Sequence, residues 1–128
     1  MAETALVADD IQMGRRAAEA FDSFGPEARA LFWFYMVEAG EWRLVVATPV
    51  VDEAGPKAAY TQIAKTLDRE GIADELPLRR VSAMGADDPL VALLRKGIRT
   101  GPGISGIRFS NNVINGVHID DAYIYRMQ

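Results

Sequence analysis

The stretch that decides the fold is Leu31-Phe32-Trp33-Phe34-Tyr35-Met36-Val37, in which every side chain is apolar or aromatic. A strand with one face in water alternates apolar and polar residues, whereas a strand covered on both faces need not. We therefore predict a strand over residues 31–37 whose two faces are both covered, each by a helix, another subunit or a ligand.

A second strand is predicted over residues 42–50, and the turn between the two sets their register. A two-residue turn would force Ala39 to a positive φ, so the sequence favours a three-residue turn with Gly40 in the left-handed conformation. This register pairs Phe34 with Leu44. One face of the hairpin is then wholly apolar, and we expect it to be the main core: Phe32, Phe34, Met36, Trp42, Leu44 and Val46.

The opposite face of this hairpin is the candidate partner surface. In the predicted register it carries Trp33, Tyr35 and Val37, with Arg43 beside them. Tryptophan, tyrosine and arginine are enriched at binding hot spots, so these four are the candidate partner-binding residues. The protein's own N-terminal helix could cover the same face instead, and the sequence leaves both alternatives open.

The rest of the chain alternates helices and strands. Apolar side chains at three- and four-residue steps predict helices over residues 4–21, from Pro56 to Gly71 and over 89–96, with a strand over 78–84. The element order is α-β-β-α-β-α-β-β. It predicts an α+β fold, in which a mixed or mainly antiparallel sheet of about five strands packs with three helices in a single domain, residues 1–128.

The C-terminal part is predicted to be a β-hairpin. Asn115-Gly116 is typical of a two-residue type I′ turn, which places Ile114 opposite Val117 and Asn111 opposite Asp120. The first strand of this hairpin, with the helix over 89–96 and the strand over 78–84, could also form a parallel crossover.

Polar residues on this hairpin form the candidate chemical site. His118 and Asp120 share a face of a regular strand, with Asn111 across from Asp120, while Asp121 points away unless a bulge intervenes. Imidazole and carboxylate groups transfer protons or bind metals. A metal site needs three or more ligands, however, and His118 is the only histidine. We therefore expect a structural cluster, in which the polar atoms of His118 and Asp120 do not approach within about 3–4 Å as a metal or proton-transfer site would require. We make no metal and no catalytic assignment; His118, Asp120 and Asp121 stay as candidates.

Residues 101–106 match the spelling GxGxxG of dinucleotide-binding loops. That motif follows a strand and opens a helix, so that the phosphate meets the helix N-terminus. Here the predicted order is reversed, with a helix before the loop and a strand after it. We expect a glycine-rich connector and no nucleotide cofactor.

Composition narrows the classes of partner. The chain has 128 residues, no cysteine, and 14 basic against 18 acidic residues, a formal net charge of −4. The absence of cysteine excludes disulfides and thiolate sites. The net negative charge argues against a nucleic-acid partner, which requires a positive protein surface. No apolar run is long enough to span a bilayer, and the N-terminal residues lack a signal-peptide pattern, so we expect no membrane partner and a cytoplasmic location.

These observations favour a non-enzymatic interaction or adaptor domain that self-associates, as a homodimer or homo-oligomer, or binds another protein through an apolar sheet face. The alternative is a small enzyme or ligand-binding protein that uses His118, Asp120 and Asn111. An adaptor should present a flat aromatic patch, whereas an enzyme should hold His118 and Asp120 in a concave pocket.

Overall fold

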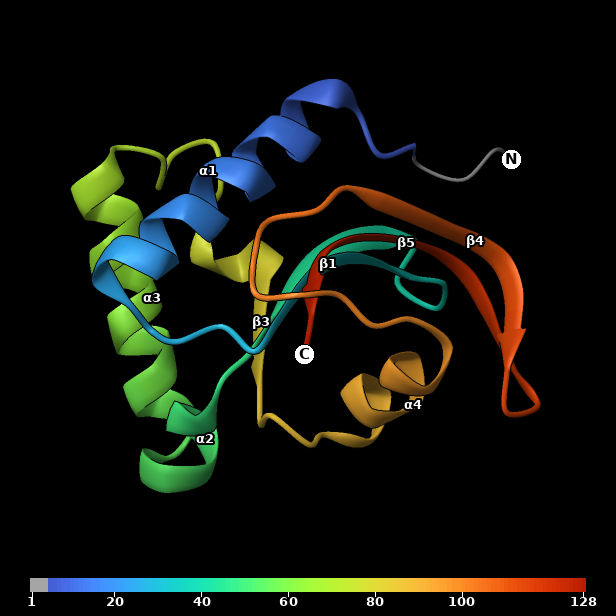
Figure 1. Ribbon diagram of the computed structural model, residues 1–128. Helices are drawn as coiled ribbons and strands as arrows, with labels where there is room; N and C mark the ends of the chain where they lie inside the picture. Colours follow the sequence, from blue (N-terminus) through green and yellow to red (C-terminus); the bar gives the residue numbers. More distant parts are fainter. Residues whose placement is uncertain (1–4) are drawn as a thin grey trace.

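The computed structural model describes residues 5–128, and its centre is a five-stranded mixed sheet with the strand order β3-β2-β1-β5-β4 (Figure 1). All neighbours pair antiparallel except β2 and β3, which are parallel. The predicted fold class and element order are confirmed. The strands are β1 (Ala30–Met36), β2 (Glu41–Ala47), β3 (Val81–Met84), β4 (Ile107–Ile114) and β5 (Val117–Met127).

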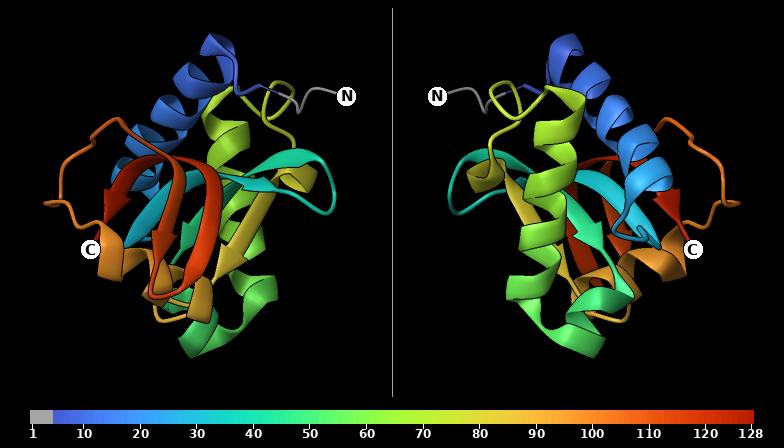
Figure 2. Two further views of the ribbon diagram at one scale, coloured as in Figure 1. Left: turned by 90° about the vertical axis from the view of Figure 1, so that its right-hand side faces the viewer. Right: turned by 90° about the vertical axis from the view of Figure 1, so that its left-hand side faces the viewer.

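Helices cover both faces of the sheet (Figure 2). The helices α1 (Ala8–Phe24) and α3 (Pro56–Glu70) lie on one face, which we call the α1 face, and α4 (Pro89–Gly97) lies on the other, the α4 face. A fourth helix, the short α2 (Pro49–Ala54), precedes α3. No helix within residues 5–128 is long and apolar enough to cross a membrane.

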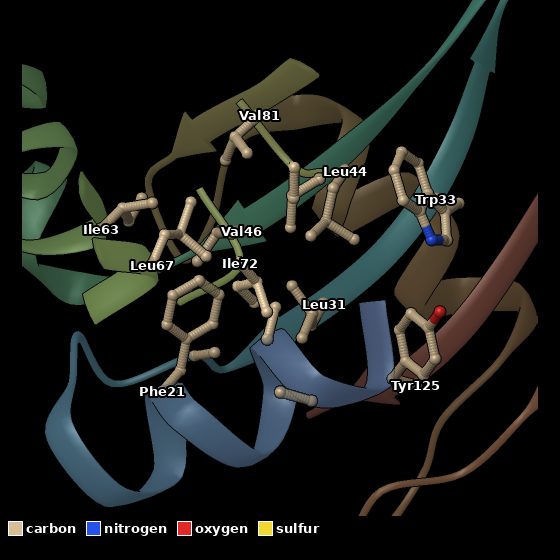
Figure 3. Packing of buried hydrophobic residues seen from close by; sticks show 14 of the residues in the cluster. Phe21, Leu31, Trp33, Leu44, Val46, Ile63, Leu67, Ile72, Val81 and Tyr125 are labelled. Carbon is tan, nitrogen blue, oxygen red and sulfur yellow. The ribbon is translucent and has the colours of Figure 1, made fainter. Parts of the chain in front are cut away.

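The core on the α1 face is the larger of two buried clusters. Figure 3 shows Phe21 of α1 reaching toward Leu67 of α3 and toward Ile72, which follows that helix. Trp33 of β1 and Tyr125 of β5 lie next to each other in the same view. The second cluster, on the α4 face, joins α4 to the sheet through Ala30, Phe32, Val45, Ala47, Val91, Leu94, Ile124 and Met127.

The predicted register of the first hairpin is wrong by one residue. Gly40 is left-handed as predicted, with φ 65, but its N–H donates to the carbonyl of Met36 and closes a four-residue turn. Phe34 therefore pairs with Arg43, and Trp33 pairs with Leu44. Because side chains alternate along a strand, this slip moves Trp33 to the face of Leu44 and Phe34 to the opposite face.

The N-terminal helix covers the aromatic face of β1. Trp33 is fully buried, and its Nε1 donates to the carbonyl of Asp10 at 3.1 Å. The hydroxyl of Tyr125 donates to the carbonyl of Ile11 at 2.6 Å. A Cβ at Gly14 would lie 2.7 Å from Trp33 Nε1 and closer still to the Tyr125 hydroxyl, so this glycine permits the close approach of α1. This face could be covered by a partner or by the chain's own N-terminal helix, and in the structure the helix covers it.

The end of the second strand and both ends of the first helix differ from their predicted positions. The second strand stops at Ala47, because the Thr48 side chain accepts a hydrogen bond from the N–H of Val50 and caps α2, with Pro49 in its first turn. The first helix begins at Ala8 and continues to Phe24, and Thr4, its predicted start, lies outside the described residues.

The parallel crossover lies elsewhere than predicted. The parallel neighbours are β2 and β3, joined through α2 and α3, whereas β3 and β4 lie at opposite edges of the sheet. The predicted strand over 78–84 begins instead with a turn of 3₁₀ helix, Leu78–Arg80. At the β3 edge the hydroxyl of Tyr60, from α3, accepts a hydrogen bond from the N–H of Ala83. This edge is therefore partly covered, whereas the middle of β4 is exposed.

Candidate binding site

The C-terminal hairpin has the predicted register. Asn115 and Gly116 both have positive φ, 53 and 81, as a type I′ turn requires, and Ile114 pairs with Val117. The ladder is interrupted once, at Asn111, whose φ is 48 and which drops out of the pairing opposite Asp120.

This interruption breaks the alternation of side chains along β5. Ile119 and Ile124 are five residues apart, yet both belong to the core on the α4 face. In a regular strand they would point to opposite faces. The break falls on Asp120 and Asp121, and these two carboxylates have different partners.

Asp121 is a structural carboxylate. Its two oxygens accept hydrogen bonds from Arg108, Nε at 2.7 Å and Nη2 at 2.6 Å, and Oδ1 also accepts from Ser110 Oγ at 2.6 Å. Burial acts to raise the pKa of Asp121, but the bonds from Arg108 and Ser110 hold that pKa below its ordinary value. With its oxygens engaged in this way, Asp121 does not join the candidate site.

His118 and Asp120 lie in contact. His118 Nε2 and Asp120 Oδ1 are 3.0 Å apart, and their side chains are 50% and 38% exposed. The expectation that these atoms would fail to approach within 3–4 Å is wrong. The third member of the predicted set, Asn111, is exposed and leaves the ladder opposite Asp120. The candidate site therefore reduces to an accessible imidazole–carboxylate pair.

This pair lines a cavity where β1 and β5 separate. Pairing between these strands ends at Phe34 opposite Ala122, although β1 continues to Met36 and β5 begins at Val117. A hollow of about 270 Å³ opens there, which we call the β1–β5 notch. The residues that line it are Phe34, Tyr35, Met36, Val37, Glu38, His118 and Asp120.

The notch combines apolar and acidic side chains. Phe34 and Met36 are half-buried, and Val37 is 57% exposed in the turn after β1. Glu38 and Asp120 supply carboxylates, and no lysine or arginine occurs among the described residues that line the notch. The notch is thus an accessible hollow with acidic and hydrocarbon surfaces.

The four predicted partner-binding residues are separated in the structure. Tyr35 and Val37 line the notch, but Trp33 is buried under α1. Arg43 is directed toward β3, where its Nε donates to Ser82 Oγ at 2.7 Å and its Nη2 to the carbonyl of Val81 at 3.1 Å. The one-residue slip of the first hairpin is the cause, because it places Trp33 and Arg43 on opposite faces of the sheet.

The chemistry available in the notch is limited. In the described part of the chain no three histidine, aspartate or glutamate side chains are arranged to hold a metal ion. A histidine oriented by a carboxylate is the base of a nucleophilic mechanism, but it needs a nucleophile within reach. The described lining includes no serine, threonine or lysine for His118 to activate.

The glycine-rich loop between α4 and β4 is hydrogen-bonded to β5. It follows α4 and leads into β4, so the context of a dinucleotide site is lacking, as the sequence predicts. The N–H of Thr100 donates to the carbonyl of Met127 at 2.9 Å, and that of Ser105 to the carbonyl of Tyr125 at 2.7 Å. These amides are engaged with β5 and are not available to a phosphate.

Little in the sequence indicates the β1–β5 notch. Phe34, Met36 and Glu38 join His118 and Asp120 only because β1 and β5, far apart in the chain, separate at this point. The nearest local signal is the polar run at 111–112 facing another at 120–121, which interrupts the alternation of both strands. Comparison of the chain with protein-family models, with curated proteins and with solved structures gave no match.

Proposed function

We propose that the protein is a non-enzymatic interaction domain that binds a partner polypeptide at the β1–β5 notch. The observation that carries this proposal is the notch itself, a hollow at the exposed end of the sheet that combines half-buried Phe34 and Met36 with an accessible pair, His118 and Asp120. Binding sites are typically concave, mainly apolar, and supplied with a few polar groups that fix orientation.

Exposed valines extend this surface. Val37 lines the notch, and Val113, which is 63% exposed, lies directly across the β4–β5 ladder from His118. Elsewhere the large apolar faces of the sheet are covered by α1, α3 and α4. Self-association through the aromatic face of β1 therefore loses its support. We instead assign the partner, whether another protein or a second copy, to the β1–β5 notch.

Site-specific photo-crosslinking tests this proposal. A photoreactive residue at position 37 or 113 should give one discrete adduct in the cells that produce the protein, and Asp120→Lys should abolish it. Position 78 is the matched control, because Leu78 is also an exposed apolar residue, 37% accessible, outside the notch. Equal adducts at positions 37, 113 and 78, or adducts that persist in Asp120→Lys, would contradict the proposal.

The second candidate function is a small enzyme with His118 as base. The 3.0 Å contact between His118 and Asp120 in a concave site favours it. A turnover lost in both His118→Ala and Asp120→Asn, with the fold intact, would establish this function in place of the first.

A further inference from the structure

We infer that the notch accepts the side chain of a lysine or arginine presented by the partner polypeptide. This inference rests on the function proposed above and adds the chemistry of the group that is recognised. Three properties of the notch support it: its charge, its apolar lining and its size.

The charge of the notch favours a cation. Glu38 and Asp120 both line it, and the described lining has no lysine or arginine to neutralise them. Arg43, which pairs with Phe34 across the first hairpin, is held at β3 by its bonds to Ser82 and Val81. His118 contacts one oxygen of Asp120, Oδ1, so a protonated imidazole would offset one carboxylate at most. A positively charged occupant therefore meets complementary charge.

The apolar lining favours a cation at the end of a hydrocarbon chain. Phe34, Met36 and Val37 supply ring, thioether and methyl surface next to the carboxylates. Lysine and arginine bury a methylene stem against such surface while their charged ends remain near water. The ring of Phe34 can also attract a cation over its face.

The size of the notch favours a single side chain. Pockets that enclose small-molecule ligands measure about 300–1,000 Å³ and bury most of the ligand. The notch, at about 270 Å³, lies just below this range, and half of the His118 side chain remains exposed. It suits the tip of a side chain whose backbone rests outside, against Val37 and the neighbouring Val113, and not an enclosed free amine.

A peptide titration followed by amide NMR tests this inference. The probes are capped tripeptides, glycine–X–glycine, in which X is lysine, arginine, norleucine or glutamate, together with n-butylammonium. The lysine and arginine peptides should shift the amide signals of residues 34–38 and 118–120 saturably. The norleucine peptide, which keeps the stem without the charge, should bind at least about fivefold more weakly, since two partly exposed ion pairs are lost.

Variants locate the interaction. Asp120→Asn and Glu38→Gln should each weaken the lysine peptide about two- to fivefold, the size expected of a partly exposed ion pair. Asp74→Asn is the matched control, because Asp74 is an exposed acid in the loop after α3, outside the notch, and it should leave binding unchanged. Unchanged amide spectra away from the substitution confirm that each variant is folded.

The alternative outcomes separate this inference from the proposed function. Equal binding of norleucine and lysine peptides, or no effect of Asp120→Asn and Glu38→Gln, would overturn the inference and leave the notch as a binding site. Binding of n-butylammonium as tight as that of the lysine peptide would overturn the assignment to a polypeptide. No shift with any probe would overturn the inference, whereas the proposed function is tested separately, by the crosslinks at positions 37 and 113.

Discussion

The two antiparallel hairpins of this sheet differ in how well their sequences predict the register of their strands. The hairpin of β1 and β2 is buried on both faces, and its register is one residue away from the predicted one. The hairpin of β4 and β5 is largely exposed at its turn, and its register is as predicted. In the second, Asn115-Gly116 fixes the turn type, and the turn fixes every pair that follows.

The first hairpin lacks such a signal. Its strands are apolar at nearly every position, so a shift by one residue still buries apolar side chains on both faces, and the pattern does not select a register. Contacts outside the hairpin distinguish the two faces: Trp33 donates to the backbone of α1, and Arg43 bonds to β3. The buried hairpin is thus specified by tertiary contacts, and the exposed one by its turn.

The largest expected effect distinguishes the two possible registers of the first hairpin. Trp33→Ala should lower the free energy of unfolding by about 3–5 kcal/mol, because the ring is fully buried under α1 and its Nε1 is bonded. Phe34→Ala should cost clearly less, because Phe34 is only half-buried beside the notch. Urea melts of both variants measure this, and a larger loss for Phe34→Ala would restore the predicted core face.

The second prediction concerns the contact that covers the first hairpin. Gly14→Ala should destabilise by about 1–3 kcal/mol, because its Cβ would overlap the Tyr125 hydroxyl and Trp33 Nε1, which outweighs the better helix propensity of alanine. Gly101→Ala is the control, since a Cβ there meets nothing within 4 Å. Thermal melts compare the two; equal stability would mean that α1 does not pack closely on β1.

The third prediction concerns the turn of the second hairpin. Gly116→Val should cost about 1–3 kcal/mol, because a β-branched residue resists a φ of 81. The loss should be local: amides of β4 should exchange faster with solvent while those of β1 keep their protection. If amide exchange in β4 were unchanged in this variant, the turn would not be what holds the hairpin in register.

The smallest effect is a pH dependence on the second hairpin. The pKa of Asp121 is lowered in the folded protein, so its stabilising contribution is present at neutral pH and is lost as the pH falls through the folded pKa. Asp121→Asn should therefore be less stable than the parent at pH 7, and the difference should shrink in acid, below about pH 4. Urea melts at pH 7 and pH 3 check this, and a difference that grows in acid would reverse the assigned direction.

Features that depend on residues close together in the chain could be predicted from the sequence. The fold class, the type I′ turn, the left-handed Gly40 and the end of the Pro56 helix at Gly71 all follow from residues close in the chain. Two features depend on distant segments and could not be predicted. One is the covering of Trp33 by α1, which requires the small residue Gly14; the other is the notch, which requires β1 and β5 to separate beyond Phe34.

The central claim is that the chain's own helix α1, and not a partner subunit, covers the aromatic face of β1. Amide hydrogen exchange of the full chain, measured at micromolar and at a hundredfold higher concentration, tests it most directly. We predict that β1 amides exchange only through global unfolding at both concentrations, while the exposed middle of β4 exchanges much faster. Protection of β1 that falls to the level of β4 on dilution would contradict the claim, because a second subunit would then supply the cover.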